Sequence, residues 1–129
     1  MKIRIDELSI RFRLAESEWT HLLGSGSIRQ TTRLPGAGAS HLTCTIHHDA
    51  AAHRTTIAHD GATLAVALAP ADWLALRQSP REGVRIAIPY KDTPGSALLL
   101  IVEKDIDVAQ KRAAKKAAAL PGGAIEERT

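Results

Sequence analysis

The stretch RTTIAHDGATLAVALA, residues 54–69, indicates the fold more directly than any other part of the chain. Apolar residues alternate with small or polar ones on both sides of Asp60-Gly61, which is the pattern of a β-strand. A two-residue Asp-Gly loop between such segments favours the type I′ turn of a β-hairpin. With this loop, Ile57 is expected to lie opposite Leu64. The stretch therefore predicts two antiparallel strands with a shared apolar face.

Alternation of the same period recurs on both sides of this hairpin. The further segments that show it or read as strands are 3–5, 10–14, 28–34, 41–48, 84–88 and 98–102. The last of them, LLLIV, is apolar at every position, as is typical of a central strand covered on both faces. Two other segments, AESEWTHLL and PADWLALRQ, space their apolar residues by three or four, which is the helical period. We therefore predict an α+β fold, with a mostly antiparallel sheet of about six or seven strands and two short helices.

Length and composition favour one domain. The 129 residues are enough for a single core, and only 3% of them are aromatic, so the core must consist mainly of Ile, Leu, Val and Ala. We place the domain at residues 1–108. Residues 109–129 form a basic, Ala- and Lys-rich tail, in which AQKRAAKKAAAL has high helix propensity. No internal repeat and no domain linker are evident.

Charge and cysteine content indicate the class of protein. The net charge of +3 permits binding to a polyanion without requiring it. The single cysteine allows no disulfide within the chain, and charged residues interrupt the first residues, MKIRIDELSIRFRL, as they would not in a signal peptide. The apolar run 97–102 is too short to cross a bilayer. We expect a cytoplasmic protein that does not bind a membrane.

Four short motifs resemble a family of small uncharacterised bacterial proteins, known as a domain of unknown function. They are MKIRI, SIRFRL, SEWTHL and LLLIVEKD, at residues 1–5, 9–14, 17–22 and 98–105. The resemblance implies where the fold begins and ends. It implies no activity, cofactor or site residue. Members of that family carry an acidic tail after the last motif, whereas this chain has a basic one, so a function carried by the tail is not expected to transfer.

Histidines provide one candidate site. Four lie close together in the sequence, at His47, His48, His53 and His59. Because neighbouring residues of a strand point to opposite faces, His47 and His48 cannot both join one site. A metal site needs three or four converging ligands, and the candidates are His48, His53 and His59. The alternative is a set of exposed or hydrogen-bonded histidines at strand ends. We favour it because no CxxC or HExxH motif is present, and we expect no cofactor.

Nucleophilic chemistry finds little support in the sequence. Cys44 shares its predicted strand face with Leu42 and Ile46, which indicates a buried core thiol. The Gly-Ser-Gly-Ser segment at 24–27 lacks the strand–turn–helix setting of a catalytic serine. It also lacks the Gly-Lys-Ser/Thr of a phosphate-binding loop. The sequence therefore predicts no catalytic residue and favours a protein that is not an enzyme.

Two groups of basic residues could contact nucleic acid. The first is an outward-facing row on the first two predicted strands: Lys2, Arg4, Arg11 and Arg13. The second lies on one face of the predicted tail helix: Lys111, Arg112, Lys115 and Lys116. Phosphate binding needs such clusters, but single-strand binders usually add exposed aromatic platforms, and Phe12 is predicted to face the core. The alternative is a solvated sheet face and a solubilising tail.

Three hypotheses for function follow. The favoured one is a small non-enzymatic binding or protein-interaction domain, whose partner is another protein or a second copy of the chain. The second is a nucleic-acid-associated protein that uses the basic tail. The third is a metal-binding protein that uses the three candidate histidines. The sequence predicts neither the ligand nor the partner.

Overall fold

Two four-stranded sheets make up most of the part of the chain that the computed structural model describes, which is residues 1–36, 40–79 and 83–105. The strands of these residues are β1 (Lys2–Ile5), β2 (Ser9–Leu14), β3 (Ser27–Leu34), β4 (Ser40–His48), β5 (Thr56–Asp60), β6 (Thr63–Leu68), β7 (Val84–Pro89) and β8 (Ala97–Lys104). The helices are α1 (Glu16–Ser25) and α2 (Pro70–Gln78). Sheet A has the order β1-β2-β8-β7, and sheet B has the order β3-β4-β6-β5.

The predicted α+β class and the two short helices are confirmed. The predicted mostly antiparallel pairing is also confirmed, because four of the six strand pairs of the described residues are antiparallel. The number of strands and of sheets differs from the prediction, since these residues form eight strands in two mixed sheets instead of six or seven strands in one. In each sheet the two central strands are parallel, β2 with β8 and β4 with β6. Parallel neighbours cannot be joined by a tight turn. Their pairing therefore leaves no local sequence signal.

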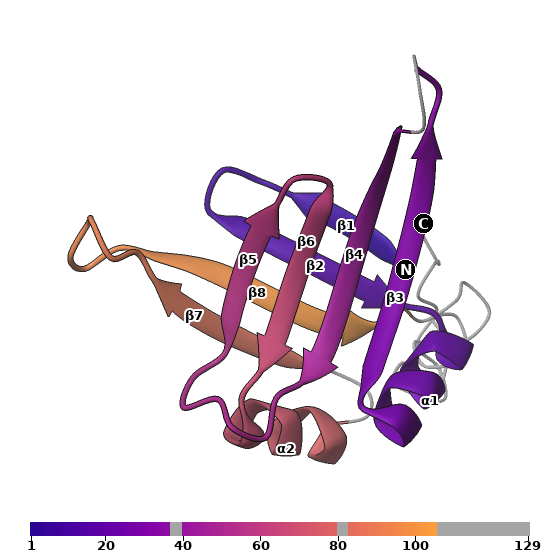
Figure 1. Cartoon of the computed structure of the whole chain (residues 1–129). Coiled ribbons are helices and arrows are strands. Elements are labelled where there is room, and N and C mark those ends of the chain that lie inside the picture. Colours follow the sequence, from indigo (N-terminus) through magenta and orange to yellow (C-terminus); the bar gives the residue numbers. More distant parts are fainter. Residues whose placement is uncertain (37–39, 80–82, 106–129) are drawn as a thin grey trace, which may run out of the picture.

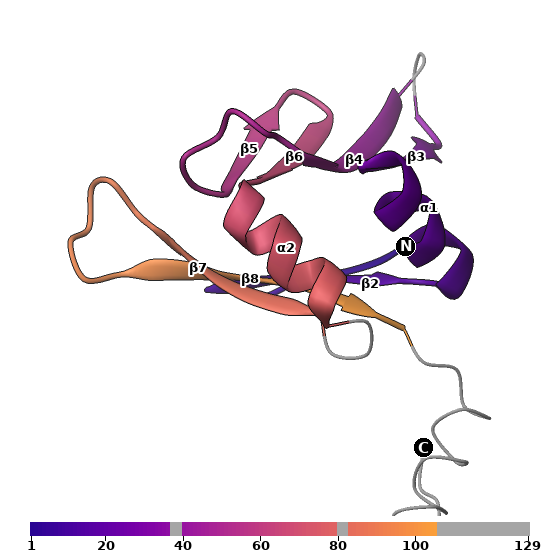
Figure 2. The same ribbon diagram turned by 90° about the horizontal axis from the view of Figure 1, so that it is seen from below.

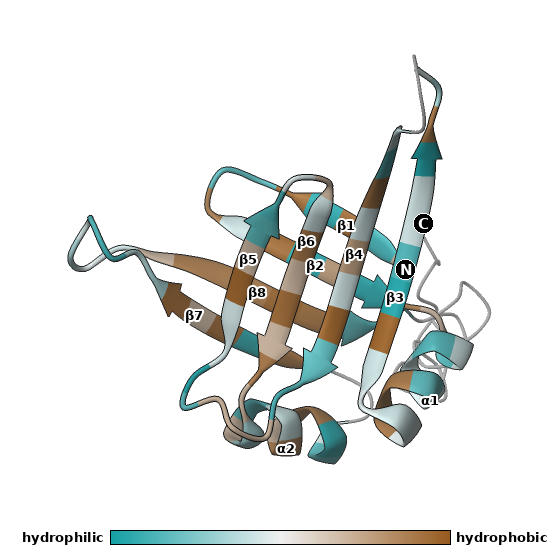
Figure 3. Cartoon of the chain, in the orientation of Figure 1, coloured by the Kyte–Doolittle hydropathy of each residue, from teal (hydrophilic) through white to brown (hydrophobic). Residues whose placement is uncertain are grey.

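The two sheets lie one above the other, and the helices lie between them at one side (Figures 1 and 2). The helix α1 connects β2 of sheet A to β3 of sheet B, and α2 leads back from β6 of sheet B to β7 of sheet A. Figure 3 shows the alternation of hydrophobic and hydrophilic residues along the strands. That alternation gives each sheet one face toward the core and one face outward.

An alanine in extended conformation is the N-cap residue of each helix, Ala15 before α1 and Ala69 before α2. In α1, the Glu18 carboxylate accepts a hydrogen bond from the Ala15 N–H at 2.8 Å. In α2, the buried Thr55 hydroxyl accepts from the Ala69 N–H at 2.9 Å and donates to Asp72 at 2.5 Å. These bonds satisfy N–H groups that a helix N-terminus leaves free. Neither of the two helices of the described residues is long and apolar enough to cross a membrane.

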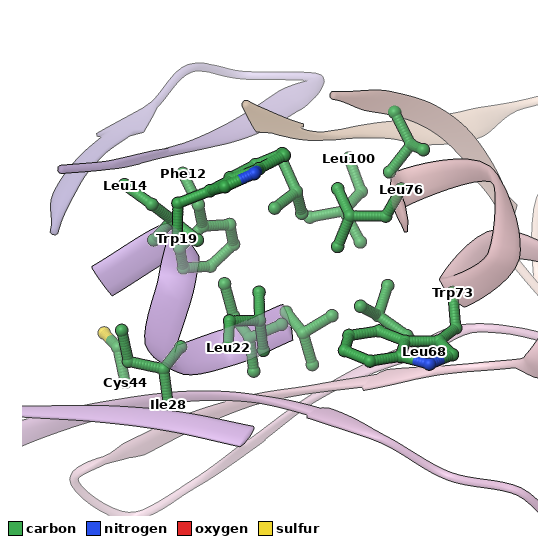
Figure 4. Packing of buried hydrophobic residues seen from close by; sticks show 14 residues of the cluster. Phe12, Leu14, Trp19, Leu22, Ile28, Cys44, Leu68, Trp73, Leu76 and Leu100 are labelled. Atoms are coloured by element: carbon green, nitrogen blue, oxygen red, sulfur yellow. The ribbon is translucent and has the colours of Figure 1, made fainter. Parts of the chain in front are cut away.

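One hydrophobic core joins both sheets and both helices (Figure 4). Its members are Phe12, Leu14, Trp19, Leu22, Ile28, Cys44, Ile46, Val66, Leu68, Trp73, Leu76, Val84, Leu100 and Val102. As the composition predicts, the core is mainly aliphatic. The prediction that 98–102 is a central strand is also confirmed, since β8 lies between β2 and β7 and buries three successive residues, 100–102.

The hairpin at Asp60 forms, but in a different register from the predicted one. Asp60 pairs with Thr63, so the two loop residues are Gly61 and Ala62, and Ile57 lies opposite Val66. Gly61 has a φ of 56°, which glycine adopts at little cost, and this places it rather than Asp60 at the first loop position. The partner of Ile57 is two residues further along β6 than predicted. Because this shift is an even number, each side chain stays on the predicted face of the sheet.

The described part of the chain forms two equivalent ββαββ units, which the sequence analysis missed. The first unit is β1-β2-α1-β3-β4 and the second is β5-β6-α2-β7-β8. Each unit gives its first hairpin to one sheet and its second hairpin to the other. With the elements aligned, LAESEWTHL (14–22) corresponds to LAPADWLAL (68–76), and Leu, Ala, Trp and Leu recur at the same positions.

Backbone hydrogen bonds outside the ladders follow the same equivalence. The Asp105 N–H donates to the Leu14 carbonyl at 2.7 Å, and in the other sheet the Asp49 N–H donates to the Leu68 carbonyl at 2.9 Å. Both bonds extend the parallel pairing at the centre of a sheet. The two units are therefore equivalent in the order of their elements and in the way their central strands pair.

Candidate functional site

A cluster of four basic side chains lies on the outer surface of sheet A. Lys2 and Arg4 belong to β1, Arg11 and Arg13 to β2, and the antiparallel register sets Lys2 opposite Arg13 and Arg4 opposite Arg11. The residues between them point into the molecule, so these four point outward. Together with Ile3 they line a hollow of about 140 Å³. We call these four residues the cationic face.

Carboxylates surround the cationic face. Arg13 donates from Nε to Oε1 of Glu103, on β8, at 2.8 Å. The Arg11 Nε lies 3.4 Å from the same oxygen, and this buried N–H has no hydrogen-bond partner. At the periphery, the Lys2 ammonium lies 2.9 Å from Asp105, and the Arg4 Nε lies 3.4 Å from Asp6. Four cations thus face three carboxylates.

This arrangement can accept a further anion. The side chains of Lys2 and Arg4 are largely exposed, and ion pairs of exposed groups stabilise a protein by only about 0–1 kcal/mol, so a ligand can replace their carboxylate partners at low cost. Arginine presents several N–H donors in a planar fork that fits carboxylate or phosphate oxygens. The Arg11 Nε is a donor that the carboxylate of Glu103 leaves without a hydrogen bond. A group with more oxygens than Glu103 would satisfy both arginines.

Sheet B offers an internal comparison for these positions. The residues equivalent to the cationic face, which we call the reference face, are Thr56, Ala58, Ala65 and Ala67. They lie on β5 and β6, the equivalent hairpin of sheet B, and pair in the equivalent register, yet none of them is charged. The fold therefore does not require basic residues at these positions. Another property must account for their presence in sheet A.

The sequence analysis identified the basic residues of this site but not the carboxylates that pair with them. The outward-facing row of Lys2, Arg4, Arg11 and Arg13 is confirmed by the register, and Phe12 is buried as predicted. The analysis missed Glu103, which reaches the site through the parallel pairing of β2 with β8. Among the described strand positions on the outer surface of sheet A, none carries an aromatic side chain.

The three candidate metal ligands are not brought together. His48 pairs with Leu68 and His59 with Leu64, so they are four residues apart along β6, about 13 Å at the usual strand rise. His53 is exposed and precedes β5. In the part of the chain that is described, no group of three or more His, Cys, Asp or Glu side chains could hold a metal ion.

His48 instead packs against a helix. Its ring is stacked on that of Trp73 in α2, with the centroids 5.0 Å apart and the planes 7° from parallel. The Nε2 atom is buried and makes no hydrogen bond. His48 therefore covers one of the two core tryptophans, which is a packing role.

Cys44 is part of the core, as predicted. It is 3% exposed and packs with the apolar cluster between the sheets (Figure 4). Burial removes the thiol from water and raises its pKa above the ordinary value of 9.0. Less thiolate is then present at neutral pH than at an exposed cysteine, which disfavours nucleophilic chemistry.

The second basic group identified in the sequence lies in the tail. Its members, Lys111, Arg112, Lys115 and Lys116, fall outside the described residues. The nucleic-acid hypothesis based on them therefore stays a prediction.

Comparison with other proteins identifies the family but no relative of known activity. No curated protein matches the chain, and no solved structure does. A family model described as a family of unknown function, DUF7009, matches residues 1–121, which is nearly the whole sequence. The expectation that the chain belongs to an uncharacterised family is thereby confirmed, and the chain belongs to the DUF7009 family.

Proposed function

We propose that the protein is a non-enzymatic binding module that holds an anionic partner on its cationic face. One observation carries the proposal. Lys2, Arg4, Arg11 and Arg13 surround a single hollow in sheet A, where the equivalent positions of sheet B carry only threonine and alanine. Neither the packing nor the pairing of the strands explains that difference, whereas attraction of an anion does.

The chemistry of these side chains supports binding rather than catalysis. Arginine and lysine stay protonated at neutral pH and only donate hydrogen bonds. They hold anions in place but do not accept a proton from a substrate. A cytoplasmic location is part of the proposal, and it is supported by the unpaired thiol of Cys44, since free cysteines are usual in reducing compartments.

Nucleic acid is the second candidate partner. Its phosphates would contact the same four cations, and the tail residues Lys111, Arg112, Lys115 and Lys116 would add to the attraction. The composition of the face counts against it. Without an aromatic side chain beside the arginines, unpaired bases have no platform on which to stack.

The proposal is tested by retention of the full chain on phosphocellulose, eluted with a salt gradient. The test variant is Arg11→Gln with Arg13→Gln. The matched control is Arg29→Gln with Arg33→Gln, which removes the same charge from exposed positions of β3 in sheet B. Both variants keep the basic tail. We expect the test variant to elute at lower salt than the control, because only the test variant loses the clustered cations.

Equal elution of the two variants would contradict the proposal. Retention would then depend on net charge alone, and the clustering of arginines in sheet A would have no role in binding.

A further inference from the structure

Each cation of the cationic face already has a carboxylate neighbour. Lys2 lies beside Asp105, and Arg4 beside Asp6. Arg11 and Arg13 share Glu103. An incoming anion must compete with these carboxylates, which are attached to the same chain and so have a high effective concentration. A ligand with one carboxylate would gain little from the exchange, so the site favours a ligand of higher charge.

Glu103 is the carboxylate that matters most in this competition. The side chains of Lys2 and Arg4 are 75% and 72% exposed, so their pairs are screened by water. Those of Arg11 and Glu103 are 29% and 24% exposed, and one oxygen of Glu103 is shared between two guanidinium groups. A phosphoryl group carries three acceptor oxygens and a charge of about −1.5 to −2, so it can satisfy both arginines where one carboxylate does not.

The dimensions of the face suit more than one such group. The Lys2–Arg13 pair and the Arg4–Arg11 pair are two residues apart along the strands, which is about 7 Å. The hollow of about 140 Å³ between them has room for several waters. Two linked phosphoryl groups could therefore lie in it, each near one pair of cations.

We infer that the ligand carries two or more linked phosphoryl groups and that it binds by displacing Glu103 from Arg11 and Arg13. This inference rests on the proposed function and names its ligand class. The phosphoryl chain can be inorganic or part of a nucleotide, because the face recognises charge and oxygen geometry and offers no surface for a base.

The test is isothermal titration calorimetry of the full chain at constant ionic strength. The probes are inorganic phosphate, pyrophosphate, tripolyphosphate, ADP and a single-stranded oligonucleotide of the same charge as tripolyphosphate. We expect tripolyphosphate to bind at least about tenfold more tightly than phosphate, because it contacts two cation pairs instead of one. If the nucleoside contributes nothing to binding, ADP will bind with the same affinity as pyrophosphate. Tighter binding of ADP would assign the phosphoryl groups to a nucleotide.

Two charge-matched variants test the role of Glu103. Glu103→Gln removes the internal competitor and is expected to raise the affinity for tripolyphosphate by about fivefold. Glu16→Gln removes the same charge from α1, where the exposed Glu16 pairs with Lys104 away from the face. It is expected to leave the affinity unchanged.

The results that would overturn this inference differ from those that would overturn the proposed binding of an anion. Equal affinity for phosphate and tripolyphosphate, equal effects of the two Gln variants, or tighter binding of the oligonucleotide would each overturn the inference. The proposed function would survive these results if Arg11→Gln with Arg13→Gln still reduced retention on phosphocellulose. If that variant behaves as its control does, both proposals fail.

Discussion

The two ββαββ units of the chain agree in their interior and differ on their outer surface. Leu14, Trp19 and Leu22 of the first unit are repeated as Leu68, Trp73 and Leu76 of the second, and all six are buried. The first hairpins carry four cations on the outside in one unit and only threonine and alanine in the other. Packing therefore determines the interior positions, whereas the outer positions of the equivalent strands are free to take up a different role.

The shared interior follows from the geometry of the sheets. Each helix crosses from one sheet to the other and must fill the same space between them (Figure 2). A large side chain one turn above a leucine fills that space, which is why Trp and Leu recur three residues apart in both helices. No such constraint acts on the outer faces.

The largest expected effect tests the agreement of the interiors. Trp19→Ala and Trp73→Ala should each lower the free energy of unfolding by about 3–5 kcal/mol, because both remove a buried indole from the same core. The control is Leu74→Ala on α2, where the side chain is 54% exposed and a change within about 0.5 kcal/mol is expected. Chemical denaturation measures all three. A cost below about 1 kcal/mol for either tryptophan would show that the units are not equivalent.

A smaller loss of stability tests a position at which the two units differ, the glycine that follows each helix and precedes the next strand. Gly26 ends α1 with a φ of 83°, and an added Cβ would meet only the Cβ of His48, at 4.0 Å. Gly83 precedes β7 with a φ of 78°, and its added Cβ would lie 1.9 Å from the Val102 carbonyl oxygen. Gly26→Ala should therefore cost about 1 kcal/mol, from the left-handed backbone alone.

Gly83→Ala should cost about 3 kcal/mol, because the backbone of β8 must also move. The same denaturation experiment measures both variants. Equal losses would contradict the close approach of Gly83 to β8 and would leave backbone conformation as the only cost.

Local patterns were sufficient to predict the elements but not their partners. Alternation located the strands, and the spacing of Trp19 and Leu22 located α1, because both signals lie within a few residues. The parallel neighbours β2 and β8 are ninety positions apart at the Arg13–Glu103 contact, and no local pattern joins them. The sequence did not reveal the repeat, because the two helical segments are identical at only four residues, those that packing requires.

The same distinction applies to the candidate site. The row of Lys2, Arg4, Arg11 and Arg13 follows from alternation along two consecutive strands, so the sequence predicted it. Glu103, which pairs with Arg13, comes from β8, so only the structure could show that it belongs to the site. Within the described residues, the three candidate metal ligands do not form a group that could hold a metal ion. His48 stacks on Trp73, and His59 lies four residues away from it along β6.

The central claim is that the cationic face serves binding and is dispensable for folding. Its most direct test is chemical denaturation of the wild type and of Arg11→Gln with Arg13→Gln, each with and without tripolyphosphate. Without the anion, the two proteins should agree within about 1 kcal/mol, as the uncharged reference face implies. The anion should stabilise the wild type, because a ligand that binds only the folded state shifts the equilibrium toward it, and should leave the variant unchanged. Equal stabilisation of both proteins, or a variant that no longer folds, would contradict the claim.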